Sequence, residues 1–158
     1  MISERQKEEL KKIFKENRVV LAYLFGSATR EKKRPLSDID IAVLFSKKVK
    51  KDNYFDKRLK LALEIDKILG IYKTEIICLN EASPLLKHRA VFYGIPIYIS
   101  NSKLKREFEL RILQEYEDFN YYLERSYQTL RKHIKEGVFG KAPLSPKAEK
   151  SFSKYVSR

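Results

Sequence analysis

The sequence predicts an α/β (α+β) chain, in which a small mixed β-sheet carries flanking helices and a long C-terminal helix follows. Over residues 19–99, short runs rich in β-branched and aromatic residues alternate with stretches of helical period. From residue 102 onward a single helical period continues without interruption. With 158 residues, of which 43% are hydrophobic, the chain can bury a core in one domain with an appendage.

Local signals place each element. The first helix, expected over residues 3–17, starts at Ser3, an N-cap residue with Gln6 in the capping-box position. In the next helix, residues at helical spacing are Phe55, Leu59, Ala62, Ile65 and Leu69, and Gly70 ends it. The expected strands are 19–25, 38–45, 73–79 and 95–99, and the expected helices after the first are 54–69 and 84–93.

The last helix has an apolar stripe along its whole length. Its members step by three or four residues: Leu104, Phe108, Ile112, Tyr116, Phe119, Leu123, Tyr127, Leu130 and Ile134. The helix is expected to end near Gly137. The stripe could meet another chain, including a second copy, or fold back on its own domain. We therefore predict three segments: residues 1–100 as a domain, 101–137 as an interface helix, and 138–158 as a linker with a basic tail.

The net charge of +13 attracts polyanions, but it is spread along the chain. No helix-turn-helix, zinc-ligand or aromatic RNA-binding motif accompanies it, so binding to nucleic acid stays an alternative that the sequence does not favour. The basic turn over residues 47–51 could hold a nucleotide or an acidic partner. No apolar run is long enough to cross a membrane, and we expect a cytoplasmic protein.

Two aspartates, Asp38 and Asp40, interrupt an apolar strand and share one of its faces. Like charges this close repel each other, so a solvated strand end or a cation between them is required. Carboxylate oxygens suit Mg²⁺ that carries nucleotide phosphates, and Glu75 on a neighbouring strand is the candidate third ligand. The three carboxylates are therefore the predicted catalytic and metal-binding residues.

A phosphate site is predicted beside these acids. Gly26 ends the first strand and lets the backbone approach a phosphate, while Ser27 offers a hydroxyl and an N–H group. Arg30 and the basic residues after it could neutralise a triphosphate. Either motif alone is a weak signal, but together, each on an apolar strand, they indicate a nucleotide site.

The stretch LFGSATREKKRPLSDIDIAVLF, residues 24–45, resembles the signature of the minimal nucleotidyltransferases, small relatives of DNA polymerase beta. That signature is Gly-Ser, ten residues, then Asp-x-Asp. Residues 74–99, TEIICLNEASPLLKHRAVFYGIPIYI, are similar to the segment that supplies the third acidic residue of the family. The sequence departs from the family pattern twice: Glu75 stands where Asp is usual, and Glu31 follows Arg30 where Gly is frequent.

The resemblance implies the polymerase-beta-like fold, phosphate binding by Gly26 and Ser27, and Mg²⁺ binding by Asp38 and Asp40. Such proteins are commonly the antitoxin of a HEPN-type ribonuclease toxin. The expected reaction is transfer of AMP from ATP to a toxin hydroxyl, with Asp40 or Glu75 taking the proton. Two alternatives stay open: an antitoxin that neutralises by binding alone, and a transferase acting on a small molecule or an RNA end.

The remaining candidates have simpler interpretations. The single cysteine, Cys78, lies in an apolar strand and is expected to pack in the core. His88 is expected on the surface, and His133 lies near a helix C-terminus, where a cation is favourable.

Overall fold

The computed structural model describes residues 3–26, 39–70 and 73–137. The elements are α1 (Glu4–Glu16), β1 (Val19–Phe25), β2 (Ile39–Phe45), the 3₁₀ helix η2 (Lys51–Asn53), α2 (Tyr54–Leu69), β3 (Thr74–Cys78), α3 (Pro84–Phe92), β4 (Ile95–Ile99) and α4 (Ser102–Lys135). The strands and helices predicted from the sequence are present, and their ends differ from the predicted ends by no more than one or two residues. The α/β (α+β) fold class is confirmed.

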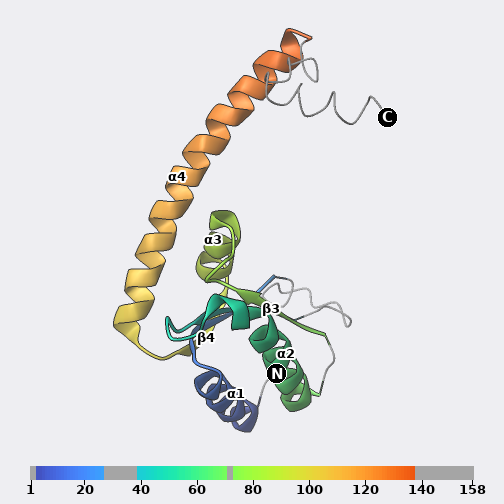
Figure 1. Ribbon diagram of the computed structural model, residues 1–158, viewed down its shortest axis with the longest axis vertical. Coiled ribbons are helices and arrows are strands. Elements are labelled where there is room, and N and C mark those ends of the chain that lie inside the picture. Colours follow the sequence, from blue (N-terminus) through green and yellow to red (C-terminus); the bar gives the residue numbers. More distant parts are fainter. Residues whose placement is uncertain (1–2, 27–38, 71–72, 138–158) are drawn as a thin grey trace. The chain divides into compact units, whose positions relative to one another are not determined.

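The four strands form one mixed sheet in the order β3-β2-β1-β4 (Figure 1). β1 pairs antiparallel with β2 on one side and with β4 on the other. β2 and β3 run parallel, so the chain must cross over between them, and α2 is that crossover. β3 and β4 are the sheet edges, and Pro96, which cannot donate a ladder hydrogen bond, lies on edge strand β4.

Each face of the sheet has its own apolar core. On one face, α1 and α2 pack against the strands, and the buried residues include Leu10, Phe14, Ala22, Ile41, Val43, Phe45, Leu61, Ile65, Ile76 and Cys78. On the other face, α3 and the start of α4 cover Leu21, Tyr23 and Ala42 together with Leu79, Ala90, Val91, Phe108 and Ile112. This division follows the alternation of side chains along a strand.

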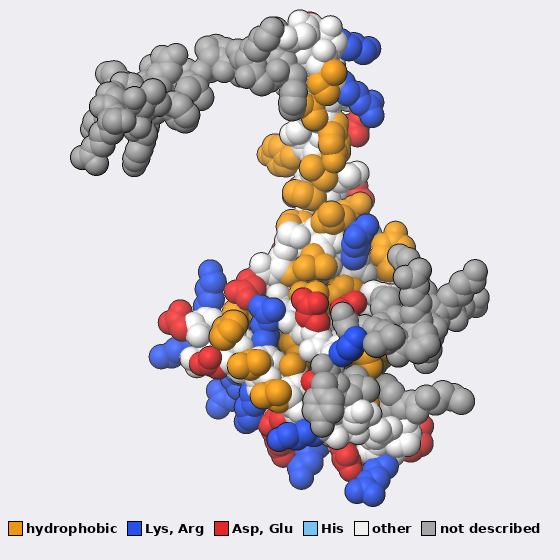
Figure 2. All heavy atoms as spheres, turned by 90° about the vertical axis from the view of Figure 1, so that its right-hand side faces the viewer, with side chains coloured by type: hydrophobic (Ala, Val, Ile, Leu, Met, Phe, Trp, Pro, Cys, Tyr) orange, Lys and Arg blue, Asp and Glu red, His pale blue; other side chains and the backbone are white. Residues whose placement is uncertain are grey.

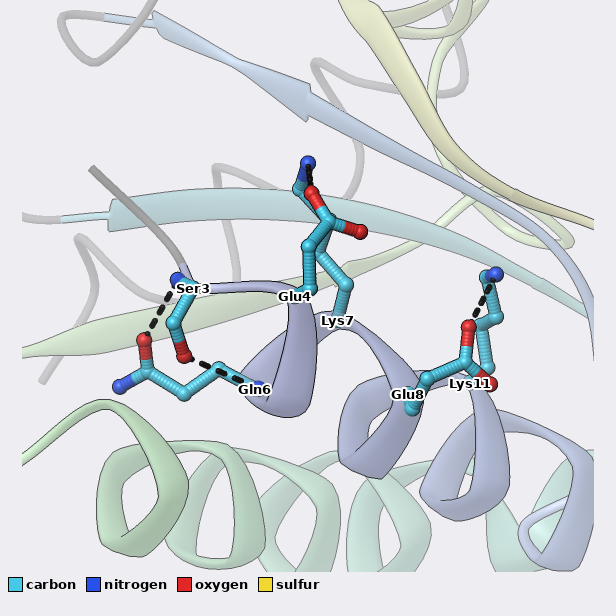
Figure 3. A network of polar contacts seen from close by, with 6 residues as sticks. All are labelled: Ser3, Glu4, Gln6, Lys7, Glu8 and Lys11. Carbon is cyan, nitrogen blue, oxygen red and sulfur yellow. Dashed lines mark hydrogen bonds and ion pairs between the residues drawn. The ribbon is translucent and has the colours of Figure 1, made fainter.

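The N-terminus of α1 confirms the predicted capping box (Figure 3). The Ser3 Oγ accepts from the Gln6 backbone N–H at 3.2 Å, and the Gln6 side chain accepts from the Ser3 N–H at 2.9 Å. The other end of α1 is tied to α2, because the buried Asn17 side chain donates to the Ile13 carbonyl at 3.0 Å and to Glu64 at 2.8 Å. Satisfied helix ends and this buried link hold α1 in place.

The apolar spacing in α2 marks its buried face only in part. Of the predicted residues, Ala62, Ile65 and Leu69 pack against the core beside the buried Leu61. Phe55 and Leu59 are instead 70% and 55% exposed. Ile65 belongs to both spacings, so the pattern alone could not distinguish the two faces. The predicted end at Gly70 is confirmed, since Gly70 caps the helix in the left-handed conformation (φ 67°).

The first half of α4 is anchored to the sheet by apolar and polar contacts. Phe108 and Ile112 are buried in the second core cluster. The Tyr23 hydroxyl donates to the Glu109 carboxylate at 3.3 Å, and Lys105 pairs with the same carboxylate at 2.7 Å. Burial raises the pKa of Tyr23, and the nearby Glu109 charge and its hydrogen bond raise it further. This part of the predicted stripe therefore folds back on its own domain.

The second half of α4 exposes the end of its stripe, Tyr127, Leu130 and Ile134, while Tyr116, Phe119 and Leu123 are half-buried. Figure 2 shows apolar side chains along this part of the helix, and two further exposed tyrosines, Tyr121 and Tyr122, lie beside the stripe. By compactness the chain divides into Met1–Phe119 and Asn120–Arg158. The three-segment division and the interface role of the helix stay predictions. Among the described helices, none is long and apolar enough to cross a membrane.

Candidate active site

The candidate site lies at one end of the sheet, where three neighbouring strands place residues side by side. Asp40, the second residue of β2, is the register partner of Phe25 in β1 and of Glu75 in β3. Register partners point to the same face, so the Asp40 and Glu75 carboxylates share the face that α3 and α4 cover. Ile76 and Cys78 pack on the opposite face, as the alternation predicted.

Gly26 brings backbone next to the Asp40 carboxylate. It has a φ of +75°, a conformation that favours glycine, and a Cβ atom built on it would overlap the Asp40 carboxylate oxygen. No other residue type could stand here without moving that carboxylate. A glycine at the end of β1 is therefore needed for the position of the Asp40 carboxylate, and its predicted role in the approach to a phosphate stays a prediction.

Three of the predicted site residues, Ser27, Arg30 and Asp38, lie outside the described residues. Within the described ranges, no group of three His, Cys, Asp or Glu side chains could by itself hold a metal ion. Asp40 and Glu75 supply two carboxylates in register, and Asp38 lies two positions before Asp40 in the sequence. This oxygen-only donor set, beside a backbone that leaves space at Gly26, fits Mg²⁺ better than a softer metal.

Strand β3, which carries Glu75, is an edge strand held by side chains from α2. The Asp66 carboxylate accepts from the Thr74 N–H at 3.1 Å, and the Arg58 Nε donates to the Ile76 carbonyl at 2.8 Å. These bonds occupy outward-facing backbone groups on both sides of Glu75. Glu75 is exposed, and the residue also lines a cavity of about 180 Å³ with Phe55, Arg58 and Leu59 of α2. Glu75 is thus open to solvent at the sheet edge.

The basic turn over residues 47–51 lies at the other end of the sheet. It follows Phe45, the last residue of β2, whereas Asp40 lies near the start of that strand. At about 3.3 Å per residue, Phe45 is roughly 16 Å from Asp40. The turn is therefore separated from Asp40 by most of the length of β2, and its suggested role in holding a nucleotide or an acidic partner stays a prediction.

The structure confirms the predicted environment of Cys78 but not that of His88. Cys78 is buried and unpaired, and burial is the main cause of its raised thiol pKa, so the thiol stays neutral, as a core residue should. His88 is not a simple surface residue, because its ring stacks on Tyr116 at 3.8 Å and on Phe92 at 4.8 Å between ring centroids. His88 thus links α3 to α4, which the local sequence did not indicate.

A mixed sheet with an aspartate and a glutamate in register, next to a glycine at a strand end, is an arrangement suited to nucleotidyl transfer. Residues 8–103 match the family described as Polymerase beta, Nucleotidyltransferase. The chain belongs to this family, as the sequence motifs indicated. No curated protein matches the sequence closely enough to count as a relative.

Solved structures with the same fold include toxin–antitoxin complexes. A mutant of the MntA–HpeT toxin–antitoxin superposes with a TM-score of 0.62 at 22% identity, over 81% of this chain and 97% of the other. A toxin–antitoxin with AMP-PNP superposes with a TM-score of 0.62 at 23% identity, over 81% of this chain and 97% of the other. A complex of the MNT antitoxin with tri-AMPylated HEPN toxin from Shewanella oneidensis gives 0.58 at 22% identity, over 82% and 96%. At these identities the likeness establishes the polymerase-beta-like fold.

Proposed function

We propose that this protein is an antitoxin that transfers AMP from ATP to a hydroxyl of a cognate HEPN-type toxin, with Mg²⁺, in the cytoplasm. The observation that carries the proposal is the register pair Asp40 and Glu75, with Gly26 against the Asp40 carboxylate. On a nucleotidyltransferase fold, two carboxylates beside a close backbone approach suit the transfer of a nucleotide to an oxygen nucleophile.

In the proposed reaction the acceptor hydroxyl oxygen forms a bond to the α-phosphorus of ATP. The bond from that phosphorus to the bridging oxygen breaks in line, and pyrophosphate leaves with the electron pair. The hydroxyl proton passes to Asp40 or Glu75, and a phosphodiester links AMP to the acceptor. Asp38, Asp40 and Glu75 would hold Mg²⁺, which supplies neutralisation of the phosphate charge when bound.

The remaining predicted residues orient the nucleotide. Gly26 lets the backbone come close to the phosphates, Ser27 donates to their oxygens, and Arg30 offsets their charge. The partner is proposed by analogy with the similar complexes, one of which contains an AMPylated HEPN toxin and another an ATP analogue. The exposed half of α4 would hold the toxin, so that proximity replaces a closed acceptor pocket.

The test uses the full chain with its co-encoded partner, Mg²⁺ and α-labelled ATP. We expect label on the partner and a mass increase in whole AMP units. The Asp38→Asn, Asp40→Asn double variant should give no transfer while remaining folded, because the change relieves like-charge repulsion. Glu75→Gln should also lower the rate strongly. An active double variant would refute the site, and a fully active Glu75→Gln would make Glu75 structural.

Two further outcomes decide between the alternatives. Neutralisation of the partner without labelling, and equally by the double variant, would support an antitoxin that acts by binding alone. This alternative is motivated by Glu75, which stands where the family usually has Asp. Label on an RNA end or a small alcohol would retain the fold and exclude the antitoxin role. Phe119→Asp with Leu123→Asp should reduce transfer to the partner by weakening docking.

A further inference from the structure

A second cavity lies at the end of the sheet opposite Asp40. Its volume is about 460 Å³, and its floor is apolar, formed by Val20 of β1, Leu44 of β2, Leu79, and Leu104 and Phe108 of α4. Small-molecule sites in proteins commonly have volumes of roughly 300–1,000 Å³ and mostly apolar walls. In size and lining this cavity resembles such sites, and the proposed transfer reaction does not use it.

The polar residues of the cavity carry an excess of positive charge. Lys47, Lys48 and Arg111 line it, and none of them has an ion pair among the described residues. The other charged lining residues are already neutralised: Lys87 pairs with Glu115 at 2.8 Å, and Glu107 lies 4.0 Å from Lys103. Three cations without an ion pair in the described part of the chain thus line a cavity with an apolar floor.

The lysines stand on a turn that hydrogen bonds and burial fix in place. The Ser46 N–H donates to the Arg18 carbonyl at 2.9 Å, and the Val49 N–H donates to the Ser46 carbonyl at 2.9 Å. Val49 is buried, so the turn cannot swing away without exposing it. Below the turn, the Asn80 side chain bonds both the N–H and the carbonyl of Phe45. The backbone at the mouth of the cavity is therefore held in place before any ligand binds.

We propose that this cavity binds a small amphipathic anion, a molecule with an apolar or aromatic body and one carboxylate, sulfonate or phosphate group. The body would lie on the floor, and the anionic group would accept from Arg111 and the turn lysines. A polyanion fits less well, because the Glu107 and Glu115 carboxylates also line the cavity. Since the floor joins the sheet to the first half of α4, the ligand also stabilises that attachment.

The test compares two probes of equal shape and opposite charge, naphthalene-2-sulfonate and naphthalen-2-ylmethylammonium, by calorimetry and by backbone amide shifts of the labelled full-length chain. The sulfonate should bind at least about tenfold more tightly than the ammonium. Its shifts should be centred on residues 46–48 and 79–80. Arg111→Ala should weaken sulfonate binding about tenfold, the loss of one charged hydrogen bond.

Matched variants make the result specific. Arg106→Ala removes the same charge from the exposed surface of the same helix, outside the cavity, and should leave sulfonate binding unchanged. Val20→Phe fills the floor of the cavity and should abolish sulfonate binding. If this variant fails to fold, the sulfonate affinity of Arg111→Ala, a change at an exposed residue, still tests the proposal. Glu75→Gln should bind the sulfonate like the wild type, which separates this proposal from the transfer reaction. Equal binding of both probes, or equal losses in Arg106→Ala and Arg111→Ala, would overturn the proposal.

Discussion

Gly26→Ala should slow AMP transfer by about 100-fold without unfolding the protein, and Gly70→Ala is its natural control. Both glycines have a positive φ, +75° and +67°. An alanine in this conformation costs about 1–2 kcal/mol, which lowers the melting temperature by about 2–8 °C for a chain of this size. Because both variants pay this backbone strain, it cannot explain a difference in activity between them.

The two positions differ in what a methyl group would meet. At Gly70 the added Cβ has no described atom within 4 Å apart from those of its chain neighbours, whereas at Gly26 the Cβ overlaps the Asp40 carboxylate. To restore ordinary contact, that carboxylate must move by roughly 1 Å or more. A displacement of this size in a catalytic group costs on the order of 100-fold in rate.

The assay is the rate of AMP transfer to the co-encoded partner, measured with the melting temperature of each variant. We expect Gly70→Ala to keep the wild-type rate with a lowered melting temperature. Gly26→Ala should lose about 100-fold in rate with a similar thermal shift. Wild-type transfer by Gly26→Ala would refute the argument that the position of the Asp40 carboxylate governs the reaction. Equal losses of rate in both variants would assign the effect to backbone strain alone.

Two further predictions concern buried titratable groups. Tyr23 has a raised pKa in the folded chain, so the unfolded chain loses this proton first and folding stability falls as the pH rises above about 10. Tyr23→Phe removes the hydrogen bond to Glu109 and should lower the free energy of unfolding at pH 7 by about 1 kcal/mol. In chemical denaturation at rising pH, the variant should lose less stability above about pH 10 than the wild type; an equal loss would contradict the role of Tyr23. Cys78, buried and with a raised pKa, should react with iodoacetamide at pH 8 far more slowly in the folded chain than in denaturant, and equal rates in the two states would show that its strand opens readily.

Much of the fold was predictable because its signals are local. The capping box of Ser3 and Gln6 starts α1, and Gly70 ends α2 in the conformation that only glycine adopts easily. These are interactions between residues three or four positions apart, so the sequence alone contains both partners. The face of α2 could not be predicted in this way. Ile65 fits two apolar spacings, and only packing against the sheet selected the one that leaves Phe55 exposed.

For the site, the sequence by itself determined which residue types are candidates to meet a nucleotide: a glycine at one strand end, two aspartates two positions apart, and a third acid further along. It could not establish the parallel register that pairs Asp40 with Glu75, nor that Phe45 carries the basic turn to the far end of the sheet. It also gave no signal for the cavity beside Arg111, because five separate segments line it. The chemical groups of a site can be read from the sequence one residue at a time. Strand register and cavities depend on how distant segments pack against each other, and only the tertiary structure decides this packing.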